Sequence, residues 1–299
     1  MTENTHRCVI CDSTKRQVLY RKDNYDEITT DDFMITKSLL KKGEVSKCVD
    51  CNFVYDTTGI NYQRYYKDTL DEQYEADKDQ RTKEFAIAFN VLNDYMGFFN
   101  EDKKILDIGC FTGVFLDYLK TTESARCKAY GIEPSKWAAE ACRRKGLNVK
   151  ESFFLDEYFK EGDFDTLTMF DVLEHTNQPV DFLLKANKIL KRNGLLLITT
   201  PNIESLFHKI FKRNFWFIEI MHLFYFSPKT IKILLERAGF EVLTIRKHYK
   251  VLKLKYAISR LKSINRLLNG LQYLTKIPIL RDLEIKFYAG QMLVIARRA

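Results

Sequence analysis

Four cysteines near the N-terminus have the spacing of metal ligands. Cys8 and Cys11 form one C-x-x-C pair, Cys48 and Cys51 form a second, and 36 residues separate the two pairs. Each pair can turn two thiolates toward one ion, so two pairs complete a tetrahedral zinc site. Because four thiolates leave no open coordination position, we predict a structural Zn²⁺ and not a catalytic one. Unrelated surface cysteines are the alternative.

A glycine-containing turn follows an apolar run in the middle of the chain, within ILDIGCFTG. Asp107 stands at the end of that run, and Gly109 and Gly113 bracket the turn before an amphipathic stretch. Glycine lets the backbone approach a ligand closely there. Glu133 ends the next apolar run, 20 residues after Gly113. An acid at that place can accept hydrogen bonds from both hydroxyls of a ribose, which predicts a nucleoside-containing cofactor.

The residue order in this turn distinguishes two classes of cofactor. A dinucleotide site uses G-x-G-x-x-G, whose glycines accommodate a pyrophosphate at a helix N-terminus. Here Phe111 stands two residues after Gly109, and Asp107 stands where a pyrophosphate would be repelled. An acid suits a ligand with a cationic amino group, such as S-adenosylmethionine, which also carries a sulfonium and no phosphate. We therefore predict S-adenosylmethionine as the cofactor.

Two histidines are candidates for catalysis, because a base that titrates near neutrality suits a hydroxyl methyl acceptor. His175 ends the run FDTLTMFDVLEH, and His222 lies in the apolar stretch IEIMHLFYFS. The alternative role for His175 is to hold its loop, and for His222 it is simple core packing. Enzymes that methylate base nitrogens often carry Asn/Asp-Pro-Pro-Tyr/Phe where this chain has FDVLEH, which disfavours that reaction.

The elements that must position these residues alternate along the chain. We expect strands within residues 103–110, 127–134, 147–152, 164–175, 195–202, 241–249 and 290–298. We expect helices within residues 113–122, 135–146, 179–194 and 227–240. This alternation predicts a Rossmann-like, doubly wound α/β fold with a seven-stranded, mostly parallel sheet. The last two strands lack a regular crossover, so we expect them to form an antiparallel edge.

Composition and charge narrow the class of protein. Hydrophobic residues make up 45% and charged residues 29% of the chain, as in globular proteins. The start MTENTHRCVICD lacks the order of a signal peptide, and no apolar stretch is long enough to span a membrane, so we expect a cytoplasmic protein. The net charge is +8, but residues 250–299 alone hold 11 basic and 2 acidic residues. The basicity is local, so composition does not predict a nucleic-acid-binding protein.

The chain divides into three expected parts. Residues 1–56 are expected to form a small zinc-ribbon-like module, residues 57–103 a helical connector, and residues 104–299 the α/β domain. The domain carries two expected insertions: a lid at 203–226 and a basic helical segment at 250–290. An apolar stripe in that segment predicts packing on the domain with a solvated basic face. Peripheral contact with a membrane surface is the alternative.

Several runs resemble the successive motifs of class I S-adenosylmethionine-dependent methyltransferases, closest to the ubiquinone-biosynthesis O-methyltransferase-like group. They are ILDIGCFTGVFL, GIEPS, FDVLEHTNQPVDFLLKANKILKRNGLLLITTPN and HLFYFSPKTIKILLERAGFEV. The resemblance covers roughly residues 104–249 and the last strand. The double C-x-x-C resembles the zinc module fused to such domains in sugar or polysaccharide biosynthesis.

The resemblance also implies roles for individual residues. Glu133 would bind the ribose, Phe170 and Asp171 would border the cofactor, and Ser152 and Phe153 are the nearest candidates for an adenine contact. The residues implied at the cofactor turn are Asp107, Gly109, Cys110, Phe111 and Gly113. Phe111 departs from the family's commoner glycine.

The expected function is S-adenosylmethionine-dependent O-methylation of a small hydroxylated substrate. A sugar or a nucleotide- or lipid-linked glycan precursor fits the resemblance. An RNA methyltransferase is the first alternative, because zinc modules and basic segments occur in that class too. A non-catalytic binding protein with the same fold is the second alternative. The expected partner is a small molecule and not a nucleic acid.

Overall fold

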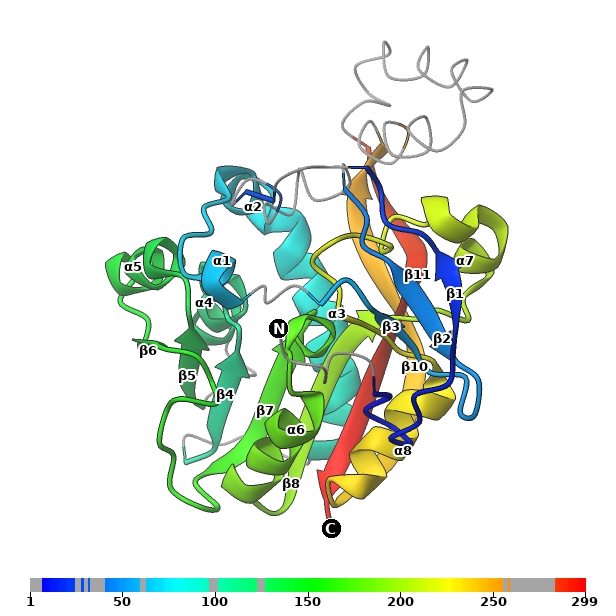
Figure 1. Cartoon of the computed structure of the whole chain (residues 1–299). Coiled ribbons are helices and arrows are strands. Elements are labelled where there is room, and N and C mark those ends of the chain that lie inside the picture. Colours follow the sequence, from blue (N-terminus) through cyan, green and yellow to red (C-terminus); the bar gives the residue numbers. More distant parts are fainter. Residues whose placement is uncertain are drawn as a thin grey trace.

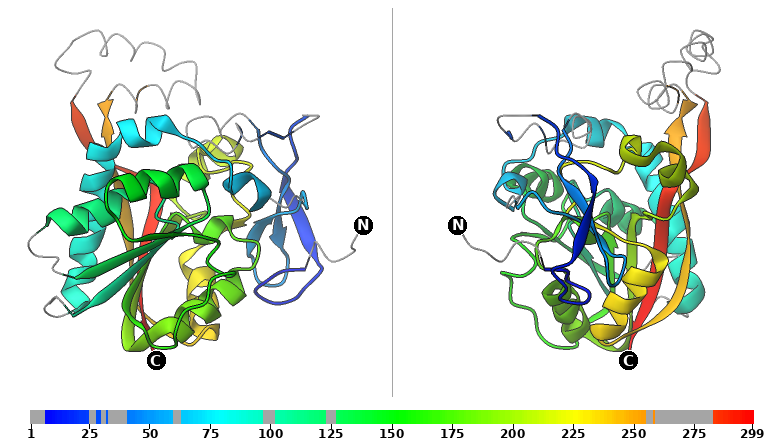
Figure 2. Two further views of the ribbon diagram at one scale, coloured as in Figure 1. Left: turned by 90° about the vertical axis from the view of Figure 1, so that its left-hand side faces the viewer. Right: turned by 45° about the vertical axis from the view of Figure 1, so that its right-hand side comes forward.

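The computed structural model describes residues 7–24, 28–29, 32, 41–59, 63–96, 102–122, 127–254, 258 and 283–299. Two sheets organise these residues, one of seven strands and one of four (Figure 1). The two sheets lie side by side, with the N-terminal strands against one flank of the larger sheet (Figure 2).

The larger sheet has the strand order β10-β11-β8-β7-β4-β5-β6. Strands β4 to β8 pair in parallel, whereas β11 is antiparallel to both β8 and β10. This confirms the predicted seven-stranded sheet with an antiparallel edge. The bounds are β4 Lys104–Ile108, β5 Lys128–Glu133, β6 Val149–Glu151, β7 Phe164–Phe170, β8 Leu190–Pro201, β10 Phe240–Lys253 and β11 Glu284–Arg298.

Helices cover both faces of this sheet, which explains why its central strands are continuously apolar. Leu293 and Ile295 of β11 pack toward α3 and α4, while Met292 and Val294 pack toward α6 and α8. The Ser227 side chain caps α8 by accepting a hydrogen bond from the Thr230 amide, and the Thr230 hydroxyl oxygen accepts one from the Ser227 amide. The helices are α1 Gln63–Tyr66, α2 Glu72–Ala76, α3 Lys78–Met96, α4 Val114–Thr121, α5 Lys136–Arg144, α6 Pro179–Ile189, α7 Leu206–Phe211 and α8 Pro228–Arg237, with short 3₁₀ turns η4 Leu173–His175 and η5 Lys212–Asn214.

The smaller sheet joins the N-terminal region to the predicted lid. Its order is β1-β2-β3-β9, all antiparallel, with β1 Arg16–Tyr20, β2 Val45–Cys48, β3 Val54–Asp56 and β9 Phe224–Tyr225. Strand β9 comes from the 203–226 insertion, and Tyr55 pairs with Phe224. The sequence pattern did not indicate this pairing, because a two-residue strand has no recognisable periodicity.

The basic 250–290 segment differs from the helical prediction at both ends. Lys250 to Lys253 continue β10, and Glu284 to Gly290 belong to β11, so these ends form a two-stranded ribbon. Most of the predicted apolar stripe, at 255–257 and 259–282, lies outside the described residues. None of the helices in the described part of the chain is both long and apolar enough to cross a membrane.

Candidate functional site

A cavity of about 1120 Å³ opens at the carboxyl ends of β4, β5 and β7, where ligands bind in open α/β sheets. The insertion after β8 forms its opposite wall through Trp216, Phe217 and His222. Pockets for one ligand of ordinary size measure about 300–1,000 Å³. The cavity therefore has room for a nucleoside cofactor together with an acceptor.

The turn after β4 forms one wall, and its backbone explains the residues found there. Gly109 has φ +70°, and a Cβ at this position would lie 2.7 Å from a methyl carbon of Val172. Phe111 also has a positive φ, 44°, which is costly for a side chain other than glycine. Its ring packs edge-on against Tyr74, with 4.5 Å between centroids. Phe111 therefore adopts a left-handed backbone geometry that glycine takes more easily, and it lines the cavity.

Glu133 lies beside this turn at the end of β5 and faces the cavity. Its two carboxylate oxygens accept hydrogen bonds from the Phe111 amide at 2.9 Å and from the Ser135 amide at 2.8 Å. Burial raises the pKa of Glu133 to about 7 despite these bonds. Because each carboxylate oxygen has a second lone pair, Glu133 can still accept hydrogen bonds from a ribose.

Three residues predicted at the cofactor turn lie behind this wall and do not line the cavity. Asp107 is buried, accepts a 2.6 Å hydrogen bond from the Thr168 hydroxyl, and has its pKa raised to about 7 by burial. Cys110 packs into a small cluster under the turn. Gly113 begins α4 with φ +75°, where a Cβ would lie 2.9 Å from the Cys142 sulfur. A cofactor contact for these three stays a prediction.

Asp171 anchors the floor of the cavity at the end of β7. Its carboxylate accepts hydrogen bonds from Thr199 at 2.9 Å, Gln291 at 2.8 Å and Lys250 at 3.1 Å. Lys250 also lies 3.4 Å from Glu84 of α3. Burial acts to raise the pKa of Asp171, but the Lys250 charge holds it well below its usual range. The network ties four strands and a helix together at the floor of the cavity.

Other predicted residues also face the cavity. Phe170 lines it next to Asp171 and packs against Phe85, with 4.6 Å between ring centroids. Ser152 and Phe153, the candidates for an adenine contact, line it near Glu133. Their contacts with a cofactor stay predictions.

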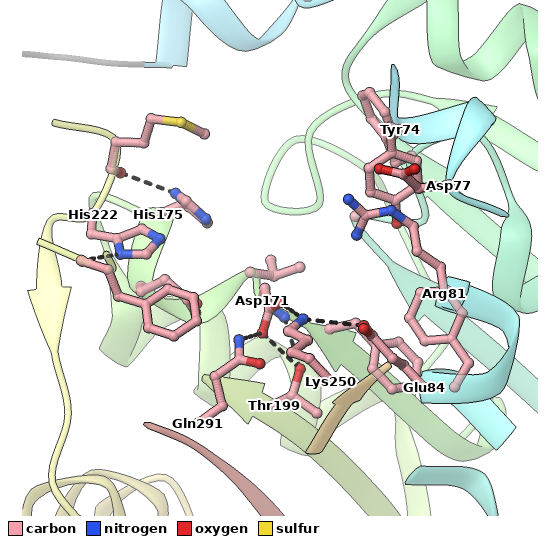
Figure 3. A pocket seen from close by; sticks show the side chains of 18 of the residues that line it. Tyr74, Asp77, Arg81, Glu84, Asp171, His175, Thr199, His222, Lys250 and Gln291 are labelled. Carbon is pink, nitrogen blue, oxygen red and sulfur yellow. Dashed lines mark hydrogen bonds and ion pairs between the residues drawn. The ribbon is translucent and has the colours of Figure 1, made fainter. Parts of the chain in front are cut away.

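Arg81 and Tyr74 are cavity residues that the sequence did not single out. The guanidinium carbon of Arg81 lies 3.6 Å from the centroid of the Tyr74 ring. Among the described residues, Arg81 Nε has no hydrogen-bond partner. Figure 3 shows Arg81 across the cavity from His175 and His222. A single arginine in the first turn of a helix has no spacing signal that could have identified it.

The two predicted histidines meet on the lid side of the cavity, with 4.6 Å between ring centroids (Figure 3). His175 Nδ1 lies 3.0 Å from the Met221 carbonyl and 3.1 Å from the Tyr66 hydroxyl. His222 Nδ1 lies 2.8 Å from the Phe217 carbonyl. Since a carbonyl only accepts, both Nδ1 atoms donate, and the lone pair of each neutral ring is on Nε2.

The two rings differ in charge. Burial and, after it, the charge of the neighbouring His222 lower the pKa of His175 to about 4. Burial also acts to lower the pKa of His222, but Glu219, whose Oε1 lies 3.0 Å from Nε2, raises it to about 9. At neutral pH and without another cation nearby, His222 is the charged member of the pair and His175 the neutral one.

The four N-terminal cysteines come together in space. Cys8 and Cys51 sulfurs lie 3.4 Å apart, Cys11 and Cys48 sulfurs lie 3.5 Å apart, and all four are within 4.8 Å of one another. No disulfide joins these thiols. A zinc–sulfur bond of about 2.3 Å places tetrahedral sulfurs about 3.8 Å apart, so the cluster has the size that a zinc ion requires.

The chain is similar in sequence to known methyltransferases. Ubiquinone biosynthesis O-methyltransferase of Methylococcus capsulatus is 29% identical over 107 residues, which cover 33% of this chain and 44% of that protein. A tRNA U34 carboxymethyltransferase of Campylobacter jejuni is 28% identical over 177 residues, covering 54% of this chain and 58% of that protein. The chain thus spans about half the length of the curated relatives it matches.

Solved structures share the fold. An S-adenosylmethionine-dependent methyltransferase of Thermotoga maritima has a TM-score of 0.51 at 18% identity, covering 80% of this chain and 98% of that one. Another, from Archaeoglobus fulgidus, has a TM-score of 0.51 at 21% identity, covering 76% and 100%. Residues 78–245 match the family model described as a methyltransferase domain. That match spans more than half of the 299 residues, and the chain therefore belongs to this methyltransferase domain family.

Proposed function

We propose that the protein is an S-adenosylmethionine-dependent methyltransferase that methylates a hydroxyl group of a small polyhydroxylated substrate, such as a sugar or glycan precursor. The observation that carries this proposal is a single cavity with the cofactor turn and Glu133 on one wall and the His175–His222 pair on another. Its volume of about 1120 Å³ leaves room for both reactants.

The cofactor fits the wall built from β4 and β5. Glu133 accepts hydrogen bonds from the ribose hydroxyls. Phe153 and Ser152 border the adenine, and Gly109 allows the methionine part of the cofactor to approach the backbone closely. Arg81, which stacks on Tyr74 beside Phe111, offers a cation for the cofactor carboxylate. Asp107 acts from behind the turn, where its negative charge favours the amino group.

The acceptor occupies the remaining space beside the lid. In the reaction, a hydroxyl oxygen forms a bond to the methyl carbon, the carbon–sulfur bond breaks with its electrons going to sulfur, and the hydroxyl proton leaves. The enzyme must align the oxygen, carbon and sulfur atoms and help remove the proton. His175 and His222 are our candidates for activating the hydroxyl, and the rings of Trp216 and Phe217 offer a stacking wall for a sugar.

We also propose that the cysteine cluster holds a structural Zn²⁺. The donor set of Cys8, Cys11, Cys48 and Cys51 and its sulfur–sulfur distances support a closed tetrahedral site. The ion would hold the N-terminal turns in place and take no part in methyl transfer.

An RNA substrate is the second candidate. One of the relatives reported above is a tRNA-modifying enzyme. The ribbon of β10 and β11 also presents Lys247 over the Tyr288 ring at 5.2 Å and Lys286 over the Tyr249 ring at 4.8 Å. Exposed cations and aromatic rings on one ribbon suit a phosphate backbone and unstacked bases.

The test uses methyl-labelled S-adenosylmethionine with two pools, a small-metabolite extract and total RNA. We expect label in a hydroxylated small molecule and a strong loss of labelling in His222→Ala. His208→Ala, in the same insertion but outside the cavity lining, is the matched control and should retain labelling. Labelling of RNA alone would replace the small-molecule proposal by the second candidate. No cofactor binding in calorimetry would contradict both.

A further inference from the structure

Glu174, His175 and His222 form a second cluster with the composition of a metal site. One ligand-capable atom from each residue lies within 4.8 Å of the other two. All three residues line the large cavity, so an ion between them would face the space assigned to the acceptor. The cluster is separate from the four cysteines, because its residues come from η4 and from the segment just before β9.

The hydrogen bonds of the two imidazoles orient them as metal ligands. His175 donates its Nδ1 proton to the Met221 carbonyl, and His222 donates its Nδ1 proton to the Phe217 carbonyl. In metal-binding histidines, the ring nitrogen that does not bind the ion almost always donates its proton to a carbonyl, carboxylate or water. This hydrogen bond fixes the tautomer and presents the other nitrogen to the ion. The Nε2 atom is therefore the ring nitrogen that each histidine can offer to an ion, and that of His222 also lies 3.0 Å from Oε1 of Glu219.

The third candidate ligand is the carboxylate of Glu174, one oxygen of which lacks a hydrogen-bond partner among the described residues. Glu174 is fully buried, and its Oε2 accepts a 3.0 Å hydrogen bond from the Thr200 hydroxyl. Within the described part of the chain, Oε1 has no hydrogen-bond partner. A buried carboxylate oxygen without a partner is costly, and a cation beside it would remove that cost.

The contact between His222 and Glu219 requires a positive charge beside the His222 ring. The Nε2 atom of His222 lies 3.0 Å from Oε1 of Glu219. Two lone-pair atoms at that distance repel each other unless a proton or a metal ion lies between or beside them. A proton on His222 is thus the rival occupant. The experiment must distinguish a proton from a metal.

We propose that Glu174, His175 and His222 bind a divalent transition-metal ion that activates the acceptor hydroxyl. This inference rests on the proposed O-methyltransferase function. Two imidazoles and a carboxylate suit Mn²⁺, Fe²⁺, Co²⁺ or Zn²⁺, and three protein ligands leave coordination positions open to a substrate oxygen. The ion lowers the pKa of the bound hydroxyl, whose proton passes to solvent. The oxygen then takes the methyl group, and the sulfonium becomes a neutral thioether.

The site implies a role for the histidine pair that differs from simple proton transfer. Each ring acts through Nε2 as a ligand and not as the base that takes the proton. The substrate class follows from the same geometry: an acceptor with a hydroxyl that can reach the ion from the cavity. A sugar or another polyol meets this requirement.

The experiment titrates the purified full-length protein with Mn²⁺ and follows free Mn²⁺ by electron paramagnetic resonance, while elemental analysis counts metal already bound. Mn²⁺ is the probe because it favours oxygen and nitrogen ligands over the thiolates of the cysteine cluster. We expect one site per chain beyond the cysteine cluster. Glu174→Gln and His222→Gln should each weaken binding about tenfold or more. His208→Gln, an unrelated histidine of the same insertion, should bind as the wild type does.

Three further readouts keep the outcomes separate. Circular dichroism checks that each variant is folded, and His175→Gln replaces any variant that is not. Equal Mn²⁺ binding by the wild type and the cluster variants, or none by the wild type, would overturn the metal proposal. Calorimetry with S-adenosylmethionine on the same samples tests the methyltransferase assignment independently. A wild type that binds cofactor but no metal contradicts only the metal site, and one that binds metal but no cofactor contradicts only the proposed function.

Discussion

Tyr55 of the N-terminal strand β3 pairs with Phe224 of β9, two residues after His222. Strand β3 follows Cys51 closely, and the buried Cys48 belongs to β2 of the same sheet. The cysteine cluster therefore supports the strand that holds the lid histidine in place. We infer that the N-terminal module controls the proposed acceptor side of the cavity through this one strand.

Loss of the cysteine cluster should therefore affect catalysis more than cofactor binding. We expect Cys48→Ser to lower the free energy of unfolding by about 3 kcal/mol or more, because a structural metal contributes directly to folding. Methyl transfer should fall strongly, since β9 loses its partner, while affinity for S-adenosylmethionine changes little. Chemical denaturation and calorimetry measure these effects. Cys127→Ser is the control, since Cys127 lies outside the cluster. Unchanged stability in Cys48→Ser would contradict the structural-metal proposal.

Replacing Glu133 should weaken the cofactor site from the ribose side. In the wild type, the Phe111 and Ser135 amides each donate a hydrogen bond to one carboxylate oxygen of Glu133. In Glu133→Gln, the side-chain NH₂ replaces one of these oxygens and faces a backbone N–H, so one hydrogen bond is lost. We expect at least tenfold weaker binding of S-adenosylmethionine, or about 1.4 kcal/mol, measured by calorimetry. Glu151→Gln removes an exposed acid on the neighbouring strand and should leave affinity unchanged. Equal affinity in both variants would place the ribose elsewhere.

The pH dependence follows from two carboxyls whose pKa values are raised. Burial raises the pKa of Asp107 and of Glu133 to about 7, above their values in an unfolded chain. Each group binds its proton more tightly when folded, so its contribution to stability is complete below about pH 4 and is lost as pH rises through 7. The cationic cofactor favours the ionised carboxyls. We therefore expect the rise in Tm caused by S-adenosylmethionine to grow between pH 5 and 7.

Melting curves with and without cofactor at several pH values test this expectation. Asp107→Asn should flatten the pH dependence, because the amide cannot ionise. A cofactor-induced shift that stays constant over the range in the wild type would show that neither carboxyl is coupled to binding.

Lys250 should be indispensable for stability, because it neutralises the buried Glu84 and the half-buried Asp171. We expect Lys250→Met to cost about 3–5 kcal/mol of unfolding free energy, since it leaves buried charge without a partner. The double variant Lys250→Met with Asp171→Asn should recover part of this loss. Urea unfolding measures both values. Lys247→Met, on the same strand but exposed, is the control. Additive losses in the double variant would mean that the network is not coupled.

Local patterns were sufficient for the α/β domain. Apolar runs alternating with amphipathic stretches predicted the seven-stranded sheet, and the turn from Asp107 to Gly113 followed by Glu133 predicted the cofactor wall. These features lie within short stretches of chain, where side-chain periodicity and glycine geometry are set by neighbouring residues. Gly109, Phe111 and Glu133 line the cavity, and their contacts with a cofactor stay a prediction.

Contacts between distant segments were not visible in the sequence. Nothing in the pattern placed Arg81 in the cavity, paired β9 with β3, or indicated that the 250–290 segment begins and ends as strands. Such contacts depend on which distant segments come together when the chain folds, and the periodicity of residues along the sequence does not indicate which segments these are.

The sequence by itself therefore determined the domain fold, the cofactor turn and the two histidines as separate candidates. Only the tertiary structure brought His175 and His222 together with Glu174, because η4 and the segment before β9 are far apart in the sequence and meet only in the folded chain. The physical reason is that local propensity forms strands and turns, whereas a site made of three side chains requires long-range packing to position them.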